Sequence, residues 1–203
     1  KYFRDFDTID SNFVRPNLVD GNFGNLLRSM VIFTHQVLVH QDINIYTFEA
    51  VEEALCRHAE LTVKLTEAFT YKFHHKDSDL KKYEDLHEEI KLDIQQLDTG
   101  QETNDKRRKN VLFQALNFIK YTLKTNFYRN NKSGFSFRLD PNYLEEVPYQ
   151  RDLLFPEVPF AIFFVHGMHF FGFHIRFKDL SRGGLRTIFT EKVEQMIIER
   201  SNV

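Results

Sequence analysis

Apolar side chains in the first 130 residues recur at intervals of three and four, which is the spacing of one face of an α-helix. The pattern predicts a helical region over residues 1–130, with Asp20 or Asn22 available to cap the first helix. Residues Asp98 to Asp105 contain glycine and asparagine but no large apolar side chain, so they read as an exposed linker. The predicted helices are Asn25 to His40, Thr47 to Lys72, Ser78 to Leu97 and Lys106 to Tyr128.

From Ser133 onward the apolar period changes from helical spacing to alternation, which is typical of strands. Eleven of the 22 phenylalanines lie between Phe135 and Phe189, and aromatic side chains favour strands. Both faces of the segment from Phe160 are apolar, which predicts a strand that is covered on both sides. The predicted strands are Gly134 to Leu139, then Phe160 to His166 and His169 to Phe177 as a hairpin around Gly167-Met168, and finally Leu185 to Phe189, before a helix from Glu191 capped by Thr190.

These patterns predict an α+β fold. Residues 1–130 form an N-terminal helical region, and residues 131–203 form a mostly β segment.

Composition narrows the functional classes. The chain has 203 residues, with 27 basic and 29 acidic side chains and a formal net charge of −2, which argues against a nucleic-acid-binding protein. Its single cysteine, Cys56, excludes an internal disulfide and a four-cysteine zinc site, and favours a cytoplasmic protein. No apolar run approaches the roughly 20 residues of a membrane helix. The chain starts at Lys1 without a leader-like segment, so we expect an internal piece of a longer polypeptide.

Several candidate sites have a simpler structural interpretation. His166, His169 and His174 lie close together, but His169 and His174 point to opposite faces of one strand, so no metal site is predicted. We interpret the His74-His75 pair as complementing a helix end, and the basic run from Lys106 to Lys109 as a solvated helix end.

Catalytic motifs are scarce as well. Cys56 lies in a helical apolar stripe and is a poor candidate nucleophile. The sequence contains neither the dinucleotide-binding G-x-G-x-x-G motif nor a phosphate-binding P-loop motif. We therefore assign no catalytic, cofactor-binding or metal-binding residues within this chain.

The segment from Asp179 to Arg186 carries the strongest chemical signal. Arg182 precedes Gly183 and Gly184; a guanidinium can bind a carboxylate through two hydrogen bonds, and two glycines let a ligand approach the backbone closely. The alternative from the residues alone is a tight turn with exposed arginines.

Ordered motifs along about a third of the chain resemble the large NAD-specific glutamate dehydrogenases. The motifs are Tyr121-Thr122-Leu123-Lys124-Thr125-Asn126-Phe127-Tyr128, Phe135-Ser136-Phe137-Arg138-Leu139-Asp140-Pro141, Phe163-Phe164-Val165-His166-Gly167, Gly172-Phe173-His174-Ile175-Arg176-Phe177-Lys178-Asp179 and Arg182-Gly183-Gly184-Leu185-Arg186.

The resemblance implies oxidation of glutamate to 2-oxoglutarate and ammonia with NAD as cofactor. It implies that Arg182, Gly183 and Gly184 contact the α-carboxylate region of the substrate, although many smaller members have lysine in place of Arg182. It also implies that residues 1–130 are a regulatory or scaffold region and that residues 131–203 are the incomplete start of the substrate-binding domain of a larger α/β enzyme. The catalytic lysines and the NAD-binding domain would follow downstream, so this fragment is expected to be inactive alone. The implied partners are glutamate or 2-oxoglutarate, the rest of the polypeptide and further copies in a homo-oligomer, with no nucleic acid or membrane. The location would be cytoplasmic, or mitochondrial in a eukaryote.

A second interpretation comes from a different class of protein. The chain would then be a helical interaction or oligomerisation module, and Gly183-Gly184 would be a structural turn.

Overall fold

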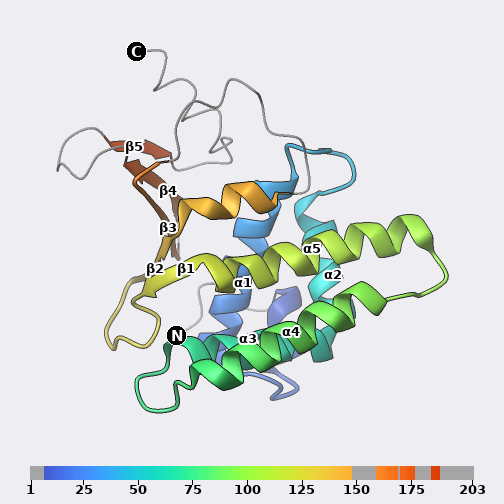
Figure 1. Cartoon of the computed structure of the whole chain (residues 1–203), viewed down its shortest axis with the longest axis horizontal. Helices are drawn as coiled ribbons and strands as arrows, with labels where there is room; N and C mark the ends of the chain where they lie inside the picture. The colour runs from blue at the N-terminus through green and yellow to red at the C-terminus, as the bar shows by residue number, and fades with distance from the viewer. Residues whose placement is uncertain (1–6, 148–158, 169, 177–183, 188–203) are drawn as a thin grey trace. The chain divides into compact units, whose positions relative to one another are not determined.

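The computed structural model describes residues 7–147, 159–168, 170–176 and 184–187 (Figure 1). The chain divides into two compact units, Lys1–Lys120 and Tyr121–Val203. Helices make up the described part of the first unit, and an antiparallel sheet dominates that of the second. This arrangement confirms the predicted α+β class.

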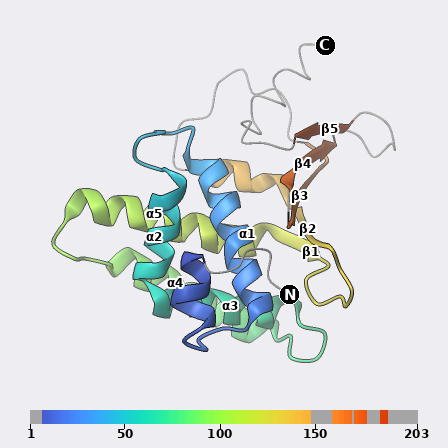
Figure 2. The ribbon, with the colours of Figure 1, turned by 180° about the vertical axis from the view of Figure 1, so that it is seen from behind.

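The helical unit starts with one short π-helix, which packs on the first long helix (Figure 2). Side-chain caps begin three of the helices: Asp20, Thr47 and Asp79 accept hydrogen bonds from backbone N–H groups three residues further on, at 2.8, 3.2 and 3.1 Å. Asp20, one of the two predicted caps, is thus confirmed. The elements are η1 (Asp10–Val14), α1 (Gly21–Leu38), α2 (Phe48–Arg57), α3 (Ala59–Phe73), α4 (Leu80–Gln96) and α5 (Glu102–Tyr121).

Helix α1 is buried on almost all sides rather than along a single stripe. Its Arg28 makes a bidentate pair with Asp7, with Nε to Oδ2 at 2.6 Å and Nη2 to Oδ1 at 2.7 Å. A third donor, Nη1, reaches Asn25 Oδ1 at 2.9 Å. The Arg28 side chain is 5% exposed and that of Asp7 16% exposed, so three short hydrogen bonds compensate a buried charge.

The predicted helix from Thr47 to Lys72 is wrong in one respect, because it is broken into α2 and α3 at His58. The His58 backbone leaves the helical region, with φ −107° and ψ 54°. The Thr62 hydroxyl donates to the Leu55 carbonyl at 2.8 Å across the break. Apolar residues continue at helical spacing on both sides, so periodicity alone does not reveal the interruption.

The predicted helix from Lys106 to Tyr128 is also wrong at both ends. Helix α5 starts at Glu102, inside the predicted linker, and ends at Tyr121, where β1 (Thr122–Thr125) follows at once. Tertiary pairing overrides the helical pattern here, because β1 pairs with the next strand. Lys72 of α3 completes the end of α5, donating from Nζ to the carbonyl oxygens of Ile119 and Lys120 at 2.8 and 2.7 Å.

The second unit contains a five-stranded sheet in the order β1-β2-β3-β4-β5, with every neighbouring pair antiparallel. The structure confirms the predicted strand Gly134 to Leu139 and the predicted hairpin of β3 and β4. The hairpin loop is longer than the predicted two residues, because the closing hydrogen bond runs from the Gly167 N–H to the Phe170 carbonyl at 2.7 Å. The predicted helix from Glu191 lies outside the described residues. The remaining elements are β2 (Gly134–Leu139), a 3₁₀-helix η2 (Pro141–Glu146), β3 (Ala161–Gly167), β4 (Phe171–Arg176) and β5 (Gly184–Thr187).

One face of the sheet is an aromatic core. Successive ring centroids lie 5.3, 6.1, 5.9 and 5.1 Å apart. The rings belong to Phe127, Phe135, Phe137, Phe164 and Phe173. Strand β3 is buried on the face of the aromatic core, whereas Phe163 and Val165 on its other face are partly exposed. The predicted burial of both faces is therefore only partly correct. Among the helices that the structure describes, none combines the length and apolarity needed to cross a membrane.

Candidate functional site

The predicted substrate motif follows β4 in the chain. Gly184 is the first residue of β5 and lies opposite Arg176, the last residue of β4. Arg182 and Gly183 lie outside the described residues, so the structure places only the final member of the predicted set. The motif thus belongs to the connection between two antiparallel strands rather than to a strand-to-helix turn.

Three basic residues and one aromatic residue share a row across the strands β1 to β4. The register pairs Lys124 with Arg138, Arg138 with Phe163, and Phe163 with His174. Directly paired residues project their side chains to the same face of an antiparallel sheet. The Phe163 and His174 rings confirm this locally, because they meet edge to face with centroids 6.1 Å apart. The face opposite the aromatic core therefore carries the cationic side chains of Lys124 and Arg138 in one row with the His174 ring.

Arg138 stands out in this row. Its residue is partly buried, and its Nε is a buried atom without a hydrogen-bond partner in the described part of the chain. Buried donors of this kind are usually satisfied. The sequence pattern did not identify Arg138 as a functional candidate, because its signal appears only when the strand register is known.

The histidines do not form a metal site in the part of the chain that is described. His166 pairs with Phe171, whereas His174 pairs with Phe163 in the other alternating set of β3 and β4 positions, so the two imidazoles lie on opposite faces. No group of three or more potential metal ligands comes together among the residues that the structure describes. His169 lies outside them.

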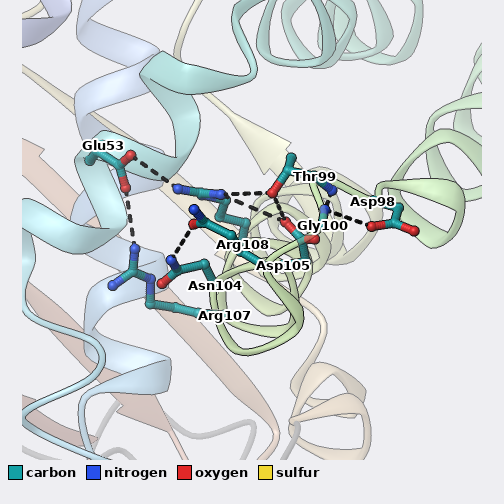
Figure 3. A network of polar contacts seen from close by, with 9 residues as sticks. Glu53, Asp98, Thr99, Gly100, Asn104, Asp105, Arg107 and Arg108 are labelled. Carbon is teal, nitrogen blue, oxygen red and sulfur yellow. Dashed lines mark hydrogen bonds and ion pairs between the residues drawn. The ribbon is translucent and has the colours of Figure 1, made fainter.

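The basic run from Lys106 to Lys109 is only partly the solvated helix end that the sequence predicts. Arg108 is buried, with a side chain that is 5% exposed, and lies between two acidic residues (Figure 3). Its Nη2 is 3.6 Å from Glu53 Oε1 on α2, and its Nη1 is 3.6 Å from Asp105 Oδ1. Arg107 lies 3.4 Å from the other oxygen of Glu53. The run therefore joins α5 to α2.

Figure 3 also shows how the turn before α5 is fixed. Asp105 accepts hydrogen bonds from the Thr99 N–H at 2.7 Å and from the Thr99 hydroxyl at 2.6 Å. The two hydrogen bonds lower the pKa of Asp105, and the bond from the Thr99 hydroxyl has the larger effect. The carboxylate thus remains ionised beside Arg108.

His58, at the break between α2 and α3, is close to the same charges. Its Nε2 is buried and has no hydrogen-bond partner among the described residues. Burial, followed by the positive charges of Arg108 and Arg57, lowers the pKa of His58. The imidazole is therefore neutral near pH 7.

Two other sequence-based interpretations concern isolated side chains. Burial raises the pKa of the Cys56 thiol to about 12, which agrees with its exclusion as a nucleophile. His74 follows the last residue of α3, and its N–H donates to the Thr70 carbonyl at 2.9 Å. This position confirms that the His74-His75 pair starts at a helix end.

Comparison with known proteins places these features in a family. The family described as "Bacterial NAD-glutamate dehydrogenase, catalytic domain" matches residues 93–199. "Glutamate dehydrogenase 2" of Dictyostelium discoideum is 37% identical over 147 residues, covering 70% of this chain and 13% of the relative. "NAD-specific glutamate dehydrogenase" of Saccharomyces cerevisiae is 40% identical over 94 residues, covering 46% and 8%.

A bacterial relative extends the match toward the N-terminal helices. "NAD-specific glutamate dehydrogenase" of Pseudomonas aeruginosa is 30% identical over 168 residues, which cover 79% of this chain but 9% of the relative. The chain thus spans about an eighth or less of these relatives. The family match includes α5, the sheet and the Arg182-Gly183-Gly184 motif. This chain belongs to the NAD-glutamate dehydrogenase family.

Proposed function

We propose that this chain is part of an enzyme that oxidises L-glutamate to 2-oxoglutarate and ammonia with NAD. The observation that carries the proposal is that the family match over residues 93–199 contains the sheet and the complete Arg182-Gly183-Gly184 motif. Residues 1–130 would serve as a regulatory or scaffold region, and residues 131–203 would open the substrate-binding domain. The proposed enzyme is a cytoplasmic homo-oligomer, or a mitochondrial one in a eukaryote.

In this proposal Arg182 binds a carboxylate of glutamate, in the α-carboxylate region, and Gly183 and Gly184 leave room for it. When bound by the downstream domain, NAD would supply the hydride acceptor for the oxidation, while Arg182, Gly183 and Gly184 would hold the substrate carboxylate. The cationic side chains of Lys124 and Arg138 on the same sheet support this role, because positive charge favours an anionic substrate over neutral competitors.

Arg182→Ala in the full-length enzyme tests the proposal. Loss of a charge-assisted hydrogen bond costs roughly 1.5–3 kcal/mol, so kcat/KM for glutamate should fall by about one to two orders of magnitude. The KM for NAD should hardly change. Arg186→Ala serves as the comparison and should lower the melting temperature more than it changes the KM for glutamate. If Arg182→Ala keeps normal kcat/KM but melts early, Arg182 has a structural role instead.

The chain by itself should neither oxidise glutamate nor bind NAD, because its sequence has no dinucleotide-binding motif. Calorimetric titration of the 203-residue chain with NAD provides the measurement. A micromolar binding isotherm would show that the assignment of NAD binding to a downstream domain is incorrect.

A further inference from the structure

Arg138 is a partly buried cation that has no counter-charge on the open face of the sheet. This face lies opposite the aromatic core and carries Arg138, Phe163, Val165 and His174. The Arg138 side chain makes no hydrogen bond or ion pair with the residues that the structure describes, and its Nε is buried. Its cross-strand neighbour is Lys124, and like charges that lie opposite each other destabilise a strand pair. The position of Arg138 therefore calls for an acidic partner.

Other arginines of comparable burial already have such a partner. Arg28, Arg107 and Arg108 each contact a carboxylate within 4 Å. A partly buried guanidinium is costly unless it is paired, because burial removes part of its hydration. Arg138 is thus an exception within this chain rather than an ordinary surface cation.

The same face leaves apolar surface open. Phe163 and Val165 of β3 are partly exposed. On the other face, Phe137 and Phe164 are fully buried and Phe173 is 2% exposed. Covering the apolar surface of β3 lowers the free energy by removing it from water. A covering element would therefore have to offer apolar side chains to β3 and one acidic group to Arg138.

The chain leaves the sheet beside this apolar surface. Strand β5 ends at Thr187, in the register row of Phe173 and Phe164. Phe163 and Val165 flank Phe164 along β3. The aromatic face is already buried, so the open face is the one that remains for the residues that follow β5.

The sequence after β5 offers both kinds of side chain. The predicted helix from Glu191 places Val193, Met196 and Ile197 at intervals of three and four, which puts them on one side. Glu194 precedes Ile197 by three residues and so borders this apolar stripe. A helix with an apolar stripe and an acidic border is complementary to an apolar sheet face with a cation beside it.

The distances allow Glu194 to reach Arg138. Strands β5 and β2 are separated by β4 and β3, so three spacings of about 4.8 Å place them about 14 Å apart. Thr187 and Glu194 are seven residues apart, and this stretch spans about 16 Å if three residues are extended and four are helical. The long side chains of Arg138 and Glu194 bridge the height between helix and sheet.

We propose that residues 191–199 form a helix that covers the open face of the sheet. Its apolar stripe packs on β3, and the Glu194 carboxylate pairs with the Arg138 guanidinium. One carboxylate beside two cations, Arg138 and Lys124, leaves a net positive charge in their row, so the row still favours an anionic substrate. The helix also fastens the end of β5, whose first residue, Gly184, belongs to the proposed substrate motif.

Disulfide trapping in the 203-residue chain tests the placement of the helix. Cys56→Ser removes the native thiol, Val165→Cys marks the sheet, and either Met196→Cys or Gln195→Cys marks the segment. Successive helical residues point about 100° apart, so Gln195→Cys is a matched control that differs in direction rather than in distance along the chain. Under mild oxidation, the pair with Met196→Cys should form its disulfide at least about fivefold faster than the control pair.

Two outcomes of the trapping overturn the proposal. Equal rates for the two pairs would show that the segment has no fixed orientation on the sheet. Disulfides that form mainly between separate chains, seen as dimers on a non-reducing gel, would show that a second copy covers the open face instead.

A double-mutant cycle tests the ion pair separately. Glu194→Gln should lower the urea midpoint of the chain, and should lower it by less than half as much when Arg138→Met is already present. Glu191→Gln lies away from the apolar stripe, so it should shift the midpoint equally in both backgrounds. An equal effect of Glu194→Gln in the two backgrounds contradicts its pairing with Arg138.

Discussion

The two buried arginines of the helical unit should respond in opposite ways to replacement by methionine. Arg28 and Arg108 each have a side chain that is 5% exposed, so both guanidinium groups have lost most of their hydration. Methionine keeps much of the volume and removes the charge in both positions. The difference in stability between the two methionine variants therefore reports how well the surrounding hydrogen-bond acceptors compensate each arginine charge.

Arg28→Met should be strongly destabilising. The change removes hydrogen bonds of 2.6, 2.7 and 2.9 Å and takes the cation away from the Asp7 carboxylate, which keeps a hydrogen bond from the Asp10 N–H at 2.8 Å. Removing one partner of a buried ion pair costs about 3–5 kcal/mol. Asp7 is 16% exposed and can regain some hydration, so we expect a loss near the lower end, about 3 kcal/mol.

Arg108→Met should be neutral or stabilising, by about 1 kcal/mol. Its contacts are 3.4 Å to Thr99 and 3.6 Å to Glu53 and Asp105, and its Nε has no partner among the described residues. Such long contacts do not offset the desolvation of the guanidinium. The acidic partners keep other interactions, because Glu53 still faces Arg107 and Asp105 still binds Thr99.

Urea unfolding of the whole chain, followed by circular dichroism at 222 nm, measures both effects. A difference of about 4 kcal/mol between the variants corresponds to a separation of about 1.3–2 M in their midpoints, given a typical urea dependence of about 2–3 kcal/mol per M. Arg28→Lys and Arg108→Lys serve as charge-retaining controls. Similar losses of stability in the two methionine variants would refute the argument that acceptor geometry decides the sign.

Two further predictions concern pH and the end of α5. Burial is the main cause of the lowered pKa of His58 and of His87. As the pH falls, these histidines are therefore protonated at a higher pH in the unfolded chain than in the folded one. The free energy of unfolding should stay constant above pH about 6.5 and fall as the pH drops below that value. Denaturation at pH 7.5 and pH 5.5 checks this, and His58→Gln should reduce the dependence. Lys72→Met removes two charge-assisted bonds to the α5 carbonyls and should cost about 2 kcal/mol in the same urea assay, whereas a loss below 0.5 kcal/mol would mean that water replaces the lysine there.

Local signals predicted much of the fold. The sequence predicted Asp20 as a helix cap, and the structure confirms it. Strand β2 has the predicted bounds. Local patterns failed where distant residues decide the conformation. The break at His58 does not interrupt the apolar period, and β1 exists because residues 137–139 offer it backbone partners.

In the candidate site, too, the sequence predicted features of local residue type but not those that depend on distant residues. Residue types predicted the Arg182-Gly183-Gly184 motif as a place for a carboxylate; the family match covers these three residues, and their role stays a prediction. They did not identify Arg138 or the burial of Arg108. The position of Arg138 depends on its partner in β3, and the burial of Arg108 depends on its packing against α2. The pattern of a single sequence contains no information on such pairings.

The direct passage from α5 into β1 has a consequence for how this family can change its length. Tyr121 ends the helix and Thr122 begins the strand, so no residue can be added between them without effect. One extra residue in β1 would move its side chains to the opposite face of the sheet. Insertions and deletions that accumulate during evolution should therefore be tolerated in residues 97–101 and 128–133 but eliminated at this junction. Selection there acts on the number of codons as well as on the amino acids that they encode.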